Sequence, residues 1–183
     1  QLKGRKIAVI DDRTAYGQGV ADEFEKAVKA AGGKAVGREF TNDKATDFTA
    51  ILTSLKAKNP DIVFFGGMDA VAGPMLRQMK QLGINAKFMG GDGICSGELP
   101  KLAAGTMADG QVVCAEAGGV EGEGKKSMDD FKVAFKKKFN TDVQLYAPYV
   151  YDAVNVMVSA MVKAGSADPA KYLPELAKIN HKG

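Results

Sequence analysis

The chain has 183 residues, of which 45% are hydrophobic and 26% are charged, so it can bury the core of one domain or two small ones. Its 25 basic and 22 acidic residues give a net charge of +3, and the one concentrated basic run lies from Lys132 to Lys138, so nucleic acid is not an expected partner. The longest apolar runs, such as residues 62–65, are four residues long, far short of the roughly 20 that a membrane-spanning helix needs.

The chain opens with patterns typical of one strand and one helix. Residues 5–12 form a short β-branched run that ends in acidic residues, which is typical of a parallel strand buried on both faces. A helix pattern follows, because apolar side chains recur at spacings of three and four until Gly32 and Gly33 stop it where a C-cap glycine would lie. Those apolar side chains are Val20, Phe24, Ala27, Val28 and Ala31.

The same unit of strand and helix repeats up to about residue 115. The other predicted strands are residues 34–40, 62–67, 86–93, which run into a glycine-rich turn, and 111–115. Helix patterns cover residues 48–57 and a segment that Gly83 closes, with Met75, Leu76, Met79 and Leu82 at helical spacing. Strands that alternate with helices imply right-handed crossovers, so we expect an α/β fold with a parallel sheet covered by helices on both sides.

The composition changes at about residue 116, where glycines and glutamates cluster. We interpret Gly118, Gly119, Gly122 and Gly124, set among Glu116, Glu121 and Glu123, as a connector. Two helices are predicted beyond it, at residues 128–139 with Phe131, Val133, Phe135 and Phe139 facing inward, and at residues 148–164. Helices without a sheet do not easily close a core, so we expect this region to pack on the first region or on a part of the protein outside this sequence.

Polar residues and glycines follow three of the predicted strands, at the edge where open parallel sheets bind ligands. They are Asp11, Asp12, Arg13, Thr14 and Tyr16 after the first strand, Gly66, Gly67, Met68 and Asp69 after the third, and Gly90, Gly91, Asp92 and Gly93 after the fourth. Glycine lets a backbone approach a ligand, and a carboxylate can hold an ammonium group. Each set alone is also typical of the end of a strand or of a turn, and Asp11 is expected to be structural. The occurrence of all three sets on one edge of the sheet favours a binding site.

The sequence offers no visible catalytic machinery. It has no GxGxxG after the first strand, no P-loop and no GxSxG motif. Its single histidine, His181, is the third residue from the end and is expected to be solvated, and Asp43 and Asp47 make a poor metal cage. We therefore expect a protein that is not an enzyme and that uses no cofactor and no metal.

The two cysteines, Cys95 and Cys114, lie 19 residues apart. This spacing suits neither a zinc cluster nor a Cys-x-x-Cys redox motif. Two alternatives stay open, a disulfide or two buried thiols. An oxidising compartment outside the cytoplasm would favour the disulfide.

Four blocks of sequence carry a family resemblance when they are taken together. They are IDDRTAYGQG at residues 10–19, FFGGMDA at residues 64–70, GGDG at residues 90–93 and LYAPYVYDAV at residues 145–154. With them, the whole chain resembles the leucine/isoleucine/valine-binding proteins of bacterial ABC importers. The resemblance implies a type I periplasmic-binding fold, in which two α/β lobes joined by three crossing strands enclose an amino acid in a cleft.

The resemblance also implies how the chain divides. Residues 1–115 are expected to form the second lobe, and residues 116–183 the returning helical part of the first lobe. Typical members of the family are roughly twice as long. Because the chain begins with Gln1 and carries neither an initiator Met nor a signal peptide, we expect it to be processed or a C-terminal fragment, with the rest of the first lobe outside this sequence.

By the same resemblance, five residues are expected to bind the ligand. Tyr16 closes over it from the second lobe, Asp92 pairs with its α-ammonium group, Met68 and Asp69 line the pocket, and Tyr146 contributes from the other lobe. The best-known members have a tyrosine in place of Met68, so the preferred side chain of the ligand stays open. The carboxylate-binding residues belong to the part outside this sequence.

The function implied by the resemblance is that of a periplasmic substrate-binding component. Such a protein captures branched-chain or other small amino acids or amides and delivers them to an ABC permease of the inner membrane, without spanning the membrane itself. The alternative is a ligand-sensing domain of the same fold, either a receptor or an amide sensor.

Overall fold

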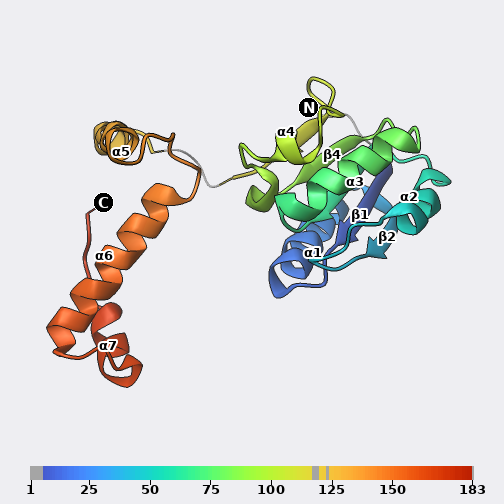
Figure 1. The fold of residues 1–183 in the computed structure, drawn as a ribbon. Coiled ribbons are helices and arrows are strands. Elements are labelled where there is room, and N and C mark those ends of the chain that lie inside the picture. Colours follow the sequence, from blue (N-terminus) through green and yellow to red (C-terminus); the bar gives the residue numbers. More distant parts are fainter. Residues whose placement is uncertain (1–5, 117–119, 123, 183) are drawn as a thin grey trace. The chain divides into compact units, whose positions relative to one another are not determined.

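The computed structural model describes residues 6–116, 120–122 and 124–182, and the chain forms two units, residues 1–117 and 118–183. The strands are β1 (Lys6–Asp11), β2 (Lys34–Phe40), β3 (Ile62–Gly66), β4 (Lys87–Gly90) and β5 (Val112–Cys114) (Figure 1). The helices are α1 (Ala15–Ala30), α2 (Thr49–Lys56), α3 (Asp69–Gln81), the 3₁₀ helix η1 (Asp92–Ile94), α4 (Leu99–Leu102), α5 (Gly124–Phe139), α6 (Ala147–Ala164) and α7 (Pro169–Leu176).

The first unit is a five-stranded parallel sheet with the order β2-β1-β3-β4-β5. The predicted α/β class and parallel sheet are therefore confirmed. The fourth strand ends at Gly90 and runs into the predicted glycine-rich turn, in which η1 begins at Asp92. The order of the strands reverses between β1 and β3, which makes the carboxyl ends of these two neighbours the place where such sheets bind ligands.

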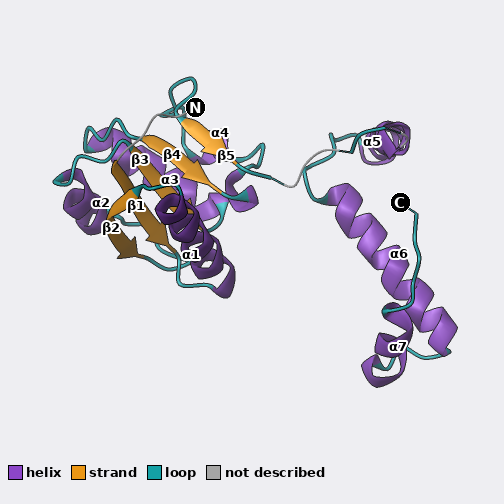
Figure 2. Cartoon of the chain, turned by 180° about the vertical axis from the view of Figure 1, so that it is seen from behind, coloured by secondary structure: helices purple, strands orange, loops and turns teal. Residues whose placement is uncertain are grey.

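Helices cover both faces of this sheet (Figure 2). On one face, α1 packs against alternate residues of β1 and β3, and the Phe24 ring stacks on Phe64 with 3.8 Å between centroids. On the other face, Ile10 and Phe65 pack with α2, α3 and α4. Successive residues of a strand point to opposite faces, so one continuous apolar run supplies both cores. Each large side chain so buried stabilises the fold by about 1.5 to 3 kcal/mol.

The second unit consists of helices in its described residues, and two predictions about α5 were wrong. The helix begins at Gly124 rather than Met128, and Val133 and Phe139 are 69% and 55% exposed rather than inward. Phe131 and Phe135 recur at a spacing of four and share one face, with Phe131 beside the Tyr151 ring of α6 at 5.3 Å between centroids. Val133 is two residues from each of them, which places it on the opposite side of the helix.

Parts of the sequence prediction lie outside the described residues. Arg5 at the start of the first strand is one, and the connector glycines Gly118 and Gly119 with Glu123 are others. Helices η1, α4 and α7 were not predicted. For η1 and α4, which have three and four residues, the segment is too short to show a helical period. Within the described ranges, we find no helix with the length and apolar character that crossing a bilayer requires.

Candidate ligand-binding site

Three segments meet at one edge of the first unit's sheet. They follow the carboxyl ends of β1, β3 and β4 and carry Tyr16, Met68 and Asp92 respectively. All strands are parallel, so these ends lie on the same side of the sheet. The three segments that the sequence pattern indicated therefore lie together at one edge of the sheet.

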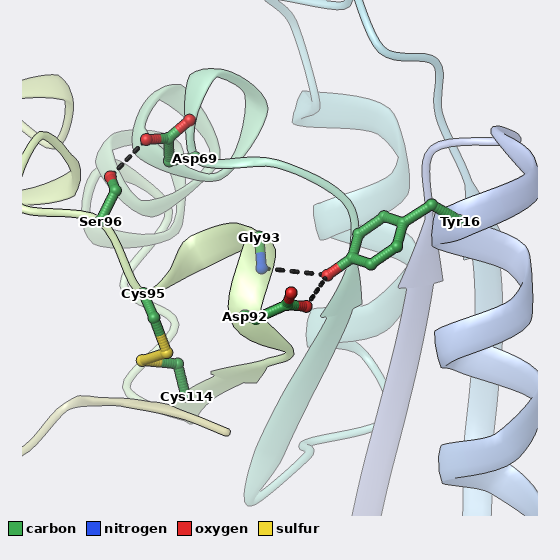
Figure 3. Close-up of a disulfide and its surroundings, with 7 residues drawn as sticks. All are labelled: Tyr16, Asp69, Asp92, Gly93, Cys95, Ser96 and Cys114. Carbon is green, nitrogen blue, oxygen red and sulfur yellow. Dashed lines mark hydrogen bonds between the residues drawn. A yellow bond between two sulfur atoms is a disulfide. The ribbon is translucent and has the colours of Figure 1, made fainter. Parts of the chain in front are cut away.

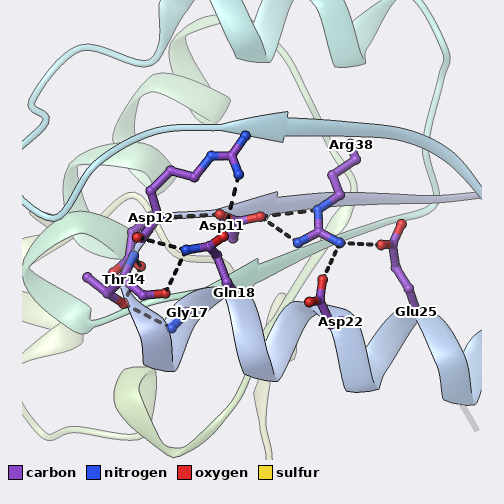
Figure 4. A network of polar contacts seen from close by, with 9 residues as sticks. Asp11, Asp12, Thr14, Gly17, Gln18, Asp22, Glu25 and Arg38 are labelled. Atoms are coloured by element: carbon purple, nitrogen blue, oxygen red, sulfur yellow. Dashed lines mark hydrogen bonds and ion pairs between the residues drawn. The ribbon is translucent and has the colours of Figure 1, made fainter.

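A buried carboxylate organises the turn that leads from β1 into α1. Asp12 is 2% exposed, and its Oδ1 accepts hydrogen bonds from the backbone N–H of Thr14 at 3.0 Å and from the Thr14 hydroxyl at 2.6 Å. The Thr14 Oγ1 in turn caps α1 by accepting from the N–H of Gly17 at 2.9 Å (Figure 4). This relay sets the direction in which α1 begins, and Tyr16 lies in its first turn.

Tyr16 bridges to the segment after β4. Its hydroxyl donates to Oδ1 of Asp92 at 2.7 Å and accepts from the backbone N–H of Gly93 at 3.0 Å (Figure 3). The aromatic ring from α1 and the carboxylate from η1 are thus held together although they are 76 residues apart in sequence. A carboxylate has about four acceptor positions, so Asp92 keeps the capacity to accept from an ammonium group.

Met68 completes this cluster from the third loop. A Cβ atom on Gly93 would lie 2.9 Å from the Met68 sulfur, 2.9 Å from the Tyr16 hydroxyl oxygen and 2.6 Å from the carbonyl oxygen of Gly67. Glycine at position 93 therefore allows the three loops to approach this closely. Met68 itself is 45% exposed, so its side chain is accessible beside Tyr16 and Asp92.

Asp69 is the first residue of α3, where a negative charge interacts favourably with the helix dipole. Its Oδ2 accepts a hydrogen bond from the hydroxyl of Ser96 (Figure 3). Ser96 follows Cys95, which forms a disulfide with Cys114 at the end of β5. Ser96 was not predicted, since a serine outside a motif gives no signal in the sequence until the fold brings it to α3.

Asp11, which was expected to be structural, pairs with Arg38 and not with the residues of this cluster that are named above. Its fully buried carboxylate accepts from the Arg38 guanidinium at 2.7 and 3.1 Å. Partial burial of Arg38 would lower its pKa, but the hydrogen bonds to Asp11, Asp22 and Glu25 outweigh burial and raise the pKa (Figure 4). The network ties β2 to β1 and α1 and leaves Arg38 permanently charged.

Tyr146 belongs to the second unit, where it is the N-cap residue of α6 and 41% exposed. Its part in the site stays a prediction. In the described ranges, no cluster of three or more His, Cys, Asp or Glu side chains could hold a metal ion.

The sequence matches the periplasmic binding protein family over residues 1–182. It is 37% identical over 168 residues to "Leu/Ile/Val-binding protein homolog 1" of Brucella abortus (strain 2308), a match that covers 92% of this chain and 44% of that protein. It is 35% identical over 176 residues to the "Leucine-, isoleucine-, valine-, threonine-, and alanine-binding protein" of Pseudomonas aeruginosa, covering 96% of this chain and 46% of that protein. The chain thus spans less than half the length of these curated relatives.

The fold is also similar to solved structures. A type 1 periplasmic binding protein from Bordetella pertussis Tohama I superposes with a TM-score of 0.83 at 22% sequence identity, covering 99% of this chain and 52% of that one. At this level of identity, the likeness identifies the fold. The chain matches about half of a type I periplasmic binding protein.

Proposed function

Because the chain belongs to the periplasmic binding protein family, we propose that it helps to capture a small amino acid through the Tyr16, Met68 and Asp92 cluster. Leucine, isoleucine and valine are the first candidates. The observation that carries the proposal is the pair of hydrogen bonds made by the Tyr16 hydroxyl, which donates to Asp92 and accepts from the backbone N–H of Gly93. They fix a carboxylate at the sheet edge where such folds bind ligands. The protein would then deliver the amino acid to an ABC permease of the inner membrane.

The chemistry of the cluster suits an α-amino acid. An ammonium group beside the part-buried Asp92 forms a charge-assisted hydrogen bond, which is about twice as strong as a neutral one. The thioether of Met68 is flexible and apolar and adapts to aliphatic side chains of different shapes. Asp69 is already bonded to Ser96, so its proposed contribution is to the wall of the pocket next to Met68.

Two further parts of the proposal concern the whole protein. Residues 1–115 would be the second lobe and residues 116–183 the returning part of the first lobe, with Tyr146 facing the ligand from there. The names of the relatives in Brucella and Pseudomonas support leucine, isoleucine and valine as candidates, and membership of the family supports the proposed periplasmic location. The residues that hold the ligand carboxylate would lie in the sequence that the longer relatives have in addition.

The proposal is tested by NMR titration of the chain with leucine, isoleucine and valine, observing the Tyr16 ring and the Gly93 amide. We expect saturable shifts at both positions, and Asp92→Asn to weaken binding by about tenfold or more, because a hydrogen bond to a charged group contributes about 1.5 to 3 kcal/mol. Tyr16→Phe should weaken binding less, since it removes the hydrogen bond that holds the Asp92 carboxylate in place but leaves the charge of Asp92.

Asp43→Asn is the matched control, because it removes one negative charge from an exposed loop residue of the same unit. It should bind like the unchanged chain. The proposal fails if none of the aliphatic amino acids, amides or aminobutyrate shifts Tyr16 or Gly93, or if Asp43→Asn and Asp92→Asn weaken binding equally.

A further inference from the structure

We propose that Ser96 and the Cys95–Cys114 disulfide form a brace that positions Asp92 and Gly93 for the ligand. The inference rests on the proposed function, and it assigns a role to Ser96 and to the disulfide. They act on the segment from Gly90 to Ser96, which carries the carboxylate and the backbone N–H that Tyr16 contacts.

The disulfide closes this segment into a ring against β5. At one end, Gly90 is the register partner of Cys114, and its carbonyl accepts from the N–H of Ala115 at 3.0 Å. At the other end, Cys95 is bonded through sulfur to the same Cys114. Asp92 and Gly93 therefore lie in the middle of a short stretch whose two ends are tied to one point of the sheet (Figure 3).

Ser96 adds an attachment on the opposite side. Its hydroxyl donates to Asp69, the first residue of α3, which directly follows Met68. The loop after β4 is thereby joined to the loop after β3, in addition to the approach at Gly93. The brace thus links two of the three loops that make the candidate site, and it links the site to β5.

The segment needs such support because its own structure is weak. η1 is a single turn of 3₁₀ helix, in which hydrogen-bond geometry is poorer than in an α-helix. In the segment itself, the N–H of Cys95 donates to the carbonyl of Asp92 at 2.9 Å, and the N–H of Ile94 to that of Gly91 at 3.3 Å. Fixing the segment before the ligand arrives removes the cost of ordering it from the binding step.

The brace is tested with the full chain in three variants: the double variant Cys95→Ala/Cys114→Ala, Ser96→Ala, and Ser96→Thr, which keeps the hydroxyl. The readouts are the amide exchange rate of Gly93 and the affinity for leucine by NMR. We expect Gly93 to exchange about tenfold faster in the double variant, by local opening, and less so in Ser96→Ala. Leucine affinity should fall in the same order, and Ser96→Thr should behave like the unchanged chain.

Leu55→Val is the control, because it removes a methylene from the buried side of α2 beside β2, at the edge of the sheet opposite β5. It should raise the amide exchange rates of core residues. The amide of Gly93, which exchanges by local opening, should keep its rate. Equal Gly93 exchange in the double variant and the unchanged chain overturns the brace. If leucine does not bind the unchanged chain, the proposed function falls, and the exchange rates still decide whether the brace orders Gly93.

Discussion

At the scale of single residues, the largest electrostatic effect on stability is expected from the buried carboxylate of Asp11. Its side chain has no exposure to solvent, whereas 23% of Arg38, its partner, is exposed. Removing one partner of a buried pair leaves an uncompensated charge. We expect Arg38→Met to lower the free energy of unfolding of the first unit by about 3 kcal/mol, the low end of the range for buried pairs, because Arg38 is partly solvated. Urea unfolding followed through the NMR signals of Val9 and Phe64 measures this.

Lys26→Met makes a matched control for Arg38→Met. Lys26 also forms an ion pair with an acidic residue of α1, but both side chains of the pair with Glu23 are more than 70% exposed, at 71% and 72%. Solvent screens such pairs, so the substitution should leave the unfolding midpoint unchanged. If the two variants lose the same free energy of unfolding, the burial of Asp11 is not the cause of the loss in Arg38→Met.

The residues of the candidate site differ in how far the sequence could reveal them. Tyr16, Met68 and Asp92 follow strand ends, so the parallel sheet alone brings their loops to one edge. Ser96 and Arg38 could not be found that way. Each makes its contact across 27 residues of sequence, to Asp69 and Asp11 respectively, through a side-chain geometry that no local pattern encodes.

At the scale of elements, the docking of α1 on β3 depends on one glycine. A Cβ atom on Gly17 would lie 2.1 Å from Oδ1 of Asp12 and 2.5 Å from the carbonyl oxygen of Gly66. Gly17→Ala must therefore push α1 away from the sheet and disturb the Asp12 and Thr14 relay. We expect a loss of about 1 to 3 kcal/mol in the stability of the first unit, as for other overpacked cores, measured by the same urea unfolding.

Gly19 provides the comparison within the same helix. A Cβ atom there would have nothing within 4 Å. Gly19→Ala should stabilise the unit by about 0.5 to 1 kcal/mol, because alanine loses less conformational freedom than glycine on entering a helix. If the two substitutions change stability in the same direction, the close approach at Gly17 is not what limits the docking of α1.

Strands and helices were predictable from the sequence where a strand is buried on both faces or where a helix has one clear apolar stripe. β1 and β3 are apolar without interruption because helices cover both faces, and α1 shows its apolar stripe clearly. The prediction of α5 was wrong where apolar residues occur on more than one side of the helix. Val133 then looks like core in the sequence although it lies away from Phe131 and Phe135.

At the scale of the whole molecule, the second unit carries apolar surface that its own helices do not cover. Of its described residues, Pro148 and Ala160 are the buried ones, whereas large apolar side chains of α6 are exposed. These are Tyr149, Val150, Tyr151, Val154, Met157, Val158 and Val162. The matched Brucella and Pseudomonas proteins have further sequence beyond the part that aligns, which could cover such a face in them.

An apolar face of this kind favours self-association of the 183-residue chain. We expect its sedimentation coefficient to rise with protein concentration, and the double variant Val154→Lys/Val158→Lys to abolish the rise. Val154 and Val158 are 56% and 49% exposed and one helical turn apart on α6, so two charges there disrupt the face without touching a core. Ala27→Lys/Ala31→Lys adds the same charge to exposed positions of the first unit and should keep the rise. A chain that sediments as a monomer at every concentration would contradict this prediction, since its exposed valines would then have no tendency to pair.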